Sequence, residues 1–369
     1  MPAALTRDNL SATTTYIPFR FVDAYHANFA ALWSSPISNN PHPYDALTPD
    51  VLLDAVESNG FLCDGSFLAL NSYENRVYQV GIEDGEPLIA KFYRPGRWPV
   101  AAIQEEHDFS SELTEHEIPV VCPLANRDGE TLFEFAGFRF ALFPRQGGYW
   151  PELNKHEDRL QFGRLMGRIH AIGANQPFVH RPNISIEDFG AASRDWLLEN
   201  NFIPEHLLQA YQTLTDELLL QIKQAWQRAG DFQNIRLHGD CHAGNILWTD
   251  DGPHFVDLDD CRMGPAVQDL WMLLSGERDE KAIQLEDFLE GYTEFHDFEA
   301  RELNLIEALR TLRLMHYAAW LGRRWQDPAF PRHFPWFNES RYWEEHILTL
   351  REQAAAMNEP PLQWGQFGI

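Results

Sequence analysis

The sequence predicts an α+β protein of two lobes, an antiparallel sheet that carries one helix and a larger part that is mostly helical. Two strand-like runs, RVYQVGI (76–82) and PLIAKFY (87–93), flank the dipeptide Asp84-Gly85, which is typical of a β-hairpin. After Pro144 the apolar residues recur at helical spacing over long stretches. The length of 369 residues exceeds one ordinary core, so more than one lobe is expected.

The smaller lobe is expected over residues 46–143. It follows an extension of uncertain order at 1–45, which mixes Thr, Ser, Asn and Pro with scattered aromatic residues. The lobe should open with a helix, because Thr48 can cap the first turn, Pro49 fits the first helical position and Asp50 suits the positive end of the helix dipole.

Further elements follow the hairpin in chain order. A helix is expected from about Val100 to His116, and the runs ETLFEF and FRFALF are two more strand candidates. The larger lobe is expected over 144–369. Its apolar residues have helical spacing in RLQFGRLMGRIHAIG (159–173) and in LNLIEALRTLRLMHYAAWLGRRW. Two short strand-loop pieces, RLHGDCHAGNILW and PHFVDLDD, interrupt these helices.

Composition and charge exclude several classes of partner. The chain has 29 basic and 55 acidic residues and a formal charge of −26, a field that repels nucleic acid and anionic lipid. The charge suits a basic peptide or a cationic substrate, although solubility is the more ordinary explanation. No apolar run approaches membrane-spanning length and no signal peptide is evident, so we expect a cytoplasmic protein without a membrane or nucleic-acid partner. The four cysteines form no Cys-x-x-Cys pair, so reduced thiols are expected.

The stretch LRLHGDCHAGNILW holds the pattern H-G-D-x-x-x-x-N, from His238 through Asp240 to Asn245. Its spacing matches the catalytic loop of protein kinases. In such a loop Asp240 would accept the proton of an attacking hydroxyl, and Asn245 would offer a neutral oxygen to Mg²⁺. Asp257 follows the apolar run PHFV at an expected strand end, so its carboxylate is a suitable second ligand for the metal.

Other interpretations of this segment stay open. His238, His242 and Asp240 could bind zinc, but no further Cys or His lies at a structural-zinc spacing. His238 is more simply a structural histidine of the loop. Cys241 could be an oxidation-sensitive thiol, but acidic neighbours should raise its pKa and leave it inert. Asp259 could assist a second metal or be a solvated turn residue.

A kinase also needs a cation for the phosphates and a carboxylate to hold that cation. Lys91 in the strand LIAKFY has the right setting, ahead of a helix that carries Glu105 and Glu106. Glu106 is the expected partner, since only one of two adjacent helical residues can face the sheet. The loop before it, LALNSYENRVYQV, lacks G-x-G-x-x-G; its Ser72 hydroxyl or its backbone N–H groups could cap a phosphate, or the loop could be a plain hairpin turn. Adenine is expected near Phe143, between the lobes.

These motifs, together with KFYRPGRW, FPRQGG, FVHRP, FVDLDD and GPAVQDLWMLL, resemble the aminoglycoside phosphotransferase and choline kinase superfamily and, within it, the bacterial stress response kinase A family. The resemblance extends from about residue 46 to the C-terminus and implies a protein-kinase-like, two-lobed fold. It implies an ATP- and Mg²⁺-dependent, non-specific Ser/Thr protein kinase that also phosphorylates itself, acts in the stress response and protects against cell death.

Roles follow from the resemblance residue by residue. Asp240 and Asp257 would be catalytic, Asn245 and Asp257 would bind the metal, and Ser72 would lie in the ATP site. Lys91 and Glu106 follow from the general kinase pattern. The expected partners are ATP and proteins with Ser/Thr hydroxyls, and we expect a monomer.

Two other functions remain as hypotheses. One is a small-molecule kinase of the choline or aminoglycoside type, which the acidic charge would suit. The other is a nucleotide-binding regulatory module without catalysis, although every catalytic residue type is present. The sequence leaves open the protein substrates, the autophosphorylated residue, the oligomeric state, the role of 1–45 and the response of Cys241 to oxidants.

Overall fold

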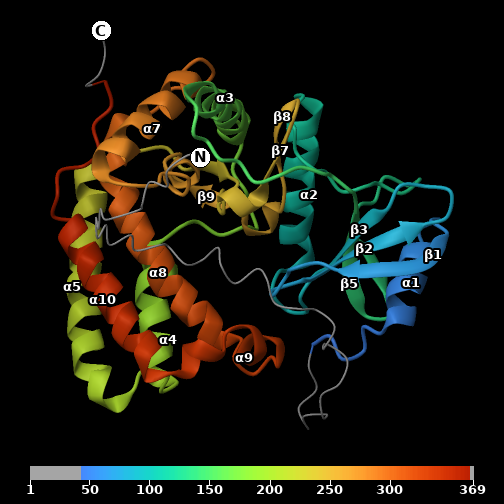
Figure 1. The fold of residues 1–369 in the computed structure, drawn as a ribbon, viewed down its shortest axis with the longest axis horizontal. Coiled ribbons are helices and arrows are strands. Elements are labelled where there is room, and N and C mark those ends of the chain that lie inside the picture. The colour runs from blue at the N-terminus through green and yellow to red at the C-terminus, as the bar shows by residue number, and fades with distance from the viewer. Residues whose placement is uncertain (1–42, 366–369) are drawn as a thin grey trace, which may run out of the picture. The chain divides into compact units, whose positions relative to one another are not determined.

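The computed structural model describes residues 43–365, so almost all of the expected extension 1–45 lies outside the described residues. The N-terminal part is a five-stranded antiparallel sheet in the order β1-β2-β3-β5-β4 with two helices (Figure 1). Its elements, in chain order, are α1 (Pro49–Glu57), β1 (Cys63–Ala69), β2 (Arg76–Ile82), β3 (Leu88–Phe92), α2 (Val100–Glu115), β4 (Phe133–Phe135) and β5 (Phe138–Pro144).

The predicted elements of this part are largely confirmed. Thr48 caps α1 by accepting a hydrogen bond from the backbone N–H of Val51, at 3.3 Å. The β2–β3 hairpin turns at Asp84, whose φ of 54° is the left-handed conformation that Asp tolerates in turns. Strand β1 was not predicted, because Asp-Gly-Ser interrupts its apolar alternation and its register with β2 shifts between Cys63 and Phe67.

Lys91 lies in the middle of the sheet. Its neighbours across the ladder are Val77 on β2 and Ala141 on β5. The next residue, Phe92, points to the other face and stacks on Phe140, with ring centroids 5.1 Å apart. Since side chains alternate along a strand, this apolar packing of Phe92 directs Lys91 to the opposite face, where the site is assembled.

The C-terminal part is mostly helical, as predicted, and contains two small two-stranded sheets, β6–β9 and β7–β8. Figure 1 shows its long helices gathered on one side of the sheet domain, with α2 between the two. The bounds are α3 (His156–Gly173), α4 (Ala192–Glu199), α5 (Leu208–Ala229), β6 (Ile235–Leu237), β7 (Ile246–Thr249), β8 (Gly252–Phe255), β9 (Arg262–Gly264), α6 (Gln268–Trp271), α7 (Arg278–Tyr292), α8 (Ile306–Arg323), α9 (Ala329–His333) and α10 (Ser340–Ala356). Short 3-10 or π turns join them, including η3 (Glu187–Ala191), η5 (Ala243–Asn245), η6 (Leu258–Asp260) and η7 (Ala300–Leu305).

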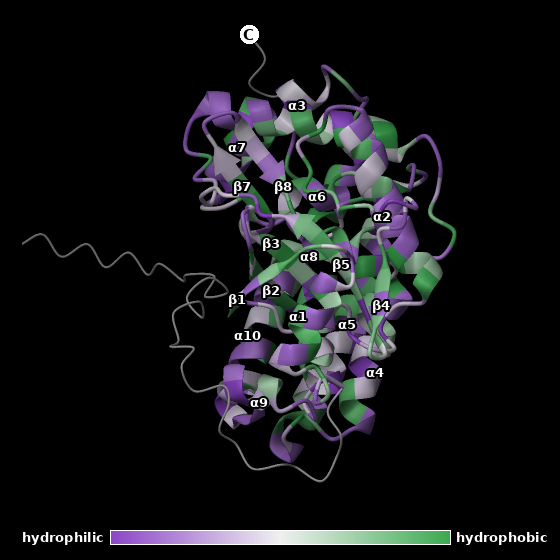
Figure 2. Cartoon of the chain, turned by 90° about the vertical axis from the view of Figure 1, so that its right-hand side faces the viewer, coloured by the Kyte–Doolittle hydropathy of each residue, from purple (hydrophilic) through white to green (hydrophobic). Residues whose placement is uncertain are grey.

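Apolar packing follows the same division. One cluster of buried residues is formed by side chains of α1 and of the sheet. Two larger clusters lie mainly among the helices of the C-terminal part. Figure 2 shows hydrophilic and hydrophobic segments alternating along helices such as α10, as expected for helices with one buried face. Within residues 43–365, no helix combines the length and the apolar character needed to cross a membrane.

The backbones of helices α3 and α7 are in close contact because glycines lie between the two helices. A Cβ added at Gly163 would collide with the carbonyl of Phe288, and one added at Gly167 would collide with the carbonyl of Tyr292. Gly291 on α7 meets the carbonyl of Leu160 in the same way. Helix α3 also packs against β6, which leads into the loop 238–245, so this contact supports that loop from behind.

Gly163→Ala should therefore destabilise the fold, since the two backbones must separate to admit a methyl group. Overpacking of this kind costs about 1–3 kcal/mol, which should lower the midpoint of urea unfolding followed by circular dichroism. Gly147→Ala is the matched control, because a Cβ there meets open space. Equal midpoints for the two variants would contradict this account of the α3–α7 contact.

Candidate active site

The loop 238–245, predicted to be catalytic, is held by the buried carboxylate of Asp269, on α6. Its two oxygens accept the backbone N–H groups of His238 and Gly239, each at 2.8 Å, and it also contacts Nε2 of His170 at 3.2 Å. Gly239 has a φ of 82°, and a Cβ there would collide with the carbonyl of Asp260. The loop therefore needs both a glycine and a buried acceptor to present the next residue, Asp240.

Asp240 faces two basic side chains from different elements. Its Oδ1 lies 2.5 Å from Nη1 of Arg313 on α8, and its Oδ2 lies 3.5 Å from Nε2 of His242. Nδ1 of His242 accepts the N–H of Gly244, so Nε2 carries the proton and points at the carboxylate. Burial raises the pKa of Asp240, but Arg313, and then His242, outweigh burial and hold that pKa well below its usual value.

Asn245 and Asp257 are brought together by the β7–β8 hairpin. Its register pairs Ile246 with Phe255, and the N–H of Val256 donates to the carbonyl of Asn245. Nδ2 of Asn245 donates to the backbone oxygen of Asp240 at 3.0 Å, which leaves its Oδ1 as the group offered to a ligand. Asp257 has a φ of 58°, and its side chain is 54% exposed. The arrangement presents a carboxylate and an amide oxygen, which are ligands that Mg²⁺ prefers.

Lys91 is almost fully buried and is surrounded by carboxylates. Its Nζ lies 2.9 Å from Asp257 Oδ1, 3.1 Å from Glu106 Oε1 and 3.4 Å from Asp259 Oδ1. Burial lowers the pKa of Lys91, but the carboxylates, first of all Asp257, outweigh burial and hold the pKa well above its usual value. The ammonium group therefore stays charged at the centre of the site.

The two adjacent glutamates of α2 point in different directions. Glu106 is buried, and its Oε2 accepts a hydrogen bond from Nη2 of Arg181 at 2.9 Å while its Oε1 contacts Lys91. Glu105 accepts the backbone N–H groups of Val179, His180 and Arg181 at 2.6 to 3.0 Å. Of the pair, the structure thus brings Glu106 to Lys91.

The loop 71–75 lies against the C-terminal part. Ser72 Oγ donates to the carbonyl of Asn75 at 3.1 Å and so stabilises the loop itself. Glu74 accepts hydrogen bonds from Nε1 of Trp320 at 2.6 Å and from Nη2 of Arg324 at 2.8 Å. The loop is thus more than a plain hairpin turn, because Trp320 and Arg324, which follow Glu74 by 246 and 250 positions, hydrogen-bond to it. The placement of Ser72 in the ATP site stays a prediction.

The sequence left Asp259 as either a second-metal ligand or a solvated turn residue, and it gave Arg97 no role. Asp259 is only 4% exposed, so it is no solvated turn residue, and its oxygens already face Lys91, Arg97 and Nδ2 of Asn75. Arg97 also contacts Asp260 at 2.8 Å. These contacts join residues 162 or more positions apart in the sequence, and no local spacing indicates them.

The alternatives for the catalytic loop find no support in its geometry. Nε2 of the buried His238 donates to the carbonyl of Val256 at 2.9 Å, so His238 does not join His242 around a metal. Cys241 is fully buried, and burial followed by the charges of Asp269 and Asp240 raises the pKa of its thiol well above the usual value. A zinc site and a reactive thiolate are both disfavoured here.

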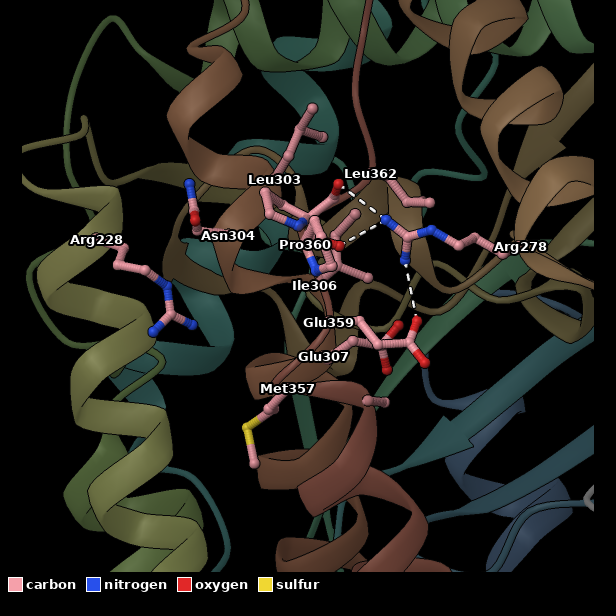
Figure 3. Close-up of a pocket in the computed structure, with 12 residues that line it drawn as sticks. Arg228, Arg278, Leu303, Asn304, Ile306, Glu307, Met357, Glu359, Pro360 and Leu362 are labelled. Atoms are coloured by element: carbon pink, nitrogen blue, oxygen red, sulfur yellow. Dashed lines mark hydrogen bonds and ion pairs between the residues drawn. The ribbon is translucent and has the colours of Figure 1, made fainter.

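Two other clusters lie outside this site. Figure 3 shows a pocket in which Arg278 is directed at Glu359 and at the backbone of Pro360. The volume of this pocket is about 50 Å³. This cavity is far smaller than the roughly 300–1,000 Å³ of ligand sites. In residues 43–365, the one group of three potential metal ligands within 4.8 Å is His156, Asp287 and Glu290. Asp287 there already pairs with Arg159 at 2.6 Å.

The chain is similar to several known proteins. The chain matches the model of the phosphotransferase enzyme family over residues 66–306. It is 46% identical over 327 residues to stress response kinase A of Escherichia coli strain K12, which covers 89% of this chain and 98% of the relative. It is 45% identical, over the same shares, to the serine/threonine protein kinase RdoA of Salmonella typhimurium.

Solved structures share the fold. An amicoumacin kinase in complex with AMP-PNP, Ca²⁺ and Ami superimposes with a TM-score of 0.65 at 20% identity, covering 85% of this chain and 95% of that one. A microcompartment-associated aminopropanol kinase gives 0.61 at 18% identity, covering 84% and 95%. At these identities the likeness concerns the fold alone, and it confirms the two-part, protein-kinase-like architecture.

Alkylation of the four cysteines tests which of their thiols are buried. Burial raises the pKa of Cys63 to about 11 and that of Cys261 to about 12, and Cys241 is buried within the loop 238–245. Only Cys122 is half-buried. Iodoacetamide at neutral pH should therefore alkylate Cys122 first in the native protein, as read by peptide mass spectrometry, and all four cysteines in guanidinium. Fast native alkylation of Cys241 would refute its assignment as inert.

Proposed function

The chain belongs to the phosphotransferase enzyme family, and from this premise we propose that it is an ATP-dependent Ser/Thr protein kinase that also phosphorylates itself. The observation that carries the proposal is the 46% identity to stress response kinase A across 98% of that protein. We further propose that it acts in the bacterial stress response and in protection from cell death, as a cytoplasmic monomer with protein substrates.

Asp240 is the proposed proton acceptor. Its side chain is 21% exposed, so an acceptor hydroxyl can reach it. Its depressed pKa keeps it ionised, so it can accept a hydrogen bond from the attacking hydroxyl and orient the nucleophile as the new P–O bond forms. Catalysis then rests on positioning and on neutralising charge rather than on covalent chemistry.

Lys91 and Glu106 are the proposed clamp for the nucleotide. The ammonium of Lys91 is charged, centrally placed in the sheet and fixed by Glu106 at 3.1 Å, so it can hold the α- and β-phosphates in one position. Ser72 and the backbone of its loop are proposed to cover the phosphates, which the docking of this loop by Trp320 supports.

The donor set fits Mg²⁺. Asn245 presents its amide oxygen and Asp257 presents an exposed carboxylate, so these two residues would hold the metal. Bound there, Mg²⁺ would neutralise phosphate charge during transfer. Asp259 is not part of this set, because its oxygens face Lys91 and Arg97.

Asp240→Asn should slow autophosphorylation by a factor of about 10²–10⁴, because the amide cannot accept the proton. Incorporation of labelled phosphate from γ-labelled ATP with Mg²⁺ measures this, and circular dichroism checks folding. Asp251→Asn, in the exposed turn between β7 and β8, is the matched control. Retained labelling in a folded Asp240→Asn protein would overturn the role of Asp240.

Asp257→Asn should remove the dependence of nucleotide binding on Mg²⁺. By calorimetry, the wild type should bind ATP more tightly with Mg²⁺ than with EDTA, whereas the variant should show no such difference. A variant that keeps the full Mg²⁺ effect would place the metal elsewhere.

A metabolite screen run beside the labelling experiment separates the proposal from its rival. Rapid turnover of a choline-like or aminoglycoside acceptor without labelling of any protein would favour a small-molecule kinase. Tight ATP binding without turnover of any acceptor would favour a regulatory module.

A further inference from the structure

One face of α8 runs from the proposed proton acceptor, Asp240, to the loop 71–75. Arg313, Tyr317, Trp320 and Arg324 recur at intervals of four, three and four residues, so they share one helical face. At one end Arg313 lies 2.5 Å from Asp240, and at the other Trp320 and Arg324 bind Glu74. This face therefore borders the space in which an acceptor must approach Asp240.

The surroundings of this face near Asp240 are cationic. The pKa of His316, on the same helix, is lowered to about 3, first by burial and then by Arg262, Arg323 and Arg313, against the opposing charge of Asp260. Arg262 is itself compensated by Asp260 at 2.7 Å. Arg313 differs from it, because its carboxylate partner is the residue that an acceptor must engage.

Arg313 is placed to reach a group carried by the acceptor. Its side chain is 41% exposed, and its guanidinium has a planar fork that can bind two oxygens of a carboxylate at once. An acceptor hydroxyl that approaches Asp240 passes this guanidinium at contact distance. A neighbouring acidic side chain would form an ion pair there, whereas a cationic neighbour would be repelled.

We propose that Arg313 is a specificity-determining residue that favours Ser/Thr acceptors flanked by Asp or Glu and disfavours cationic acceptors. This rests on the proposed protein kinase function. The overall charge of −26 acts in the opposite direction, since it attracts cations from a distance. Salt screens that field beyond about 8 Å, so the contact with Arg313 decides selectivity once the acceptor is bound.

The test compares three peptides that share one Ser acceptor and differ only in the flanking residues, Glu, Ala or Arg. We expect kcat/KM of the wild type to be roughly tenfold higher for the Glu peptide than for the Arg peptide, the scale of one charge-assisted contact. Arg313→Gln should reduce this ratio to near one, mainly through KM. Arg313→Lys should keep part of it, and Arg313→Glu should invert it. Arg351 is an exposed arginine of α10. Arg351→Glu makes the same charge change as Arg313→Glu at a different place and should keep the wild-type ratio.

The outcomes distinguish a failure of the proposed role of Arg313 from a failure of the proposed protein kinase function. If Arg313 only holds Asp240, Arg313→Gln will slow all three peptides by one factor and leave the ratio unchanged, which overturns the inference while the kinase function stands. A wild-type preference for the Arg peptide overturns it as well. If no peptide is phosphorylated while a metabolite is, the protein kinase function fails and the inference fails with it.

Discussion

The buried ammonium of Lys91 is the interaction on which the rest of the site depends. It faces carboxylates from two elements, Glu106 on α2 and the pair Asp257 and Asp259 around η6. A buried charge is tolerated only when it is paired and hydrogen-bonded, and the same holds for the buried carboxylates of Glu106 and Asp259. The sheet, α2 and the 257–260 segment thus hold one another in place through a single nitrogen atom, with Arg97 and Arg181 completing the balance of charge.

Backbone geometry is the second constraint. Asp269 uses both oxygens to hold the N–H groups of His238 and Gly239, and Gly239 and Asp257 both have positive φ. A non-glycine residue in the left-handed region costs about 1–2 kcal/mol. Such conformations persist where the surrounding contacts over-determine them, and here they occur directly before Asp240 and at Asp257 itself.

Features encoded locally could be predicted from the sequence. The hairpin around Asp84-Gly85, the capped α1 and the loop spacing from Asp240 to Asn245 each depend on a few neighbouring residues. Strand β1 was missed, because its irregular register interrupts the alternation on which the prediction depends. The partners of Asp259 and of Asp240 were missed for another reason. Arg97 and Arg313 reach them from distant segments, and a single sequence holds no signal for such pairs.

The contacts of α2 bear on how the molecule can move. Arg181 donates to the carbonyl of Ala102, Glu105 holds three backbone N–H groups of 179–181, and Glu112 pairs with Arg236 at 2.7 Å. The closest packing of α2 is with η6 and α3, not with the strands. In Figure 1 the helix stands between the sheet and the C-terminal helices. We therefore expect α2 to move with the C-terminal helices, so that a motion separating the sheet from α2 would have to break both the Lys91–Glu106 ion pair and the contact of Tyr93 with His107.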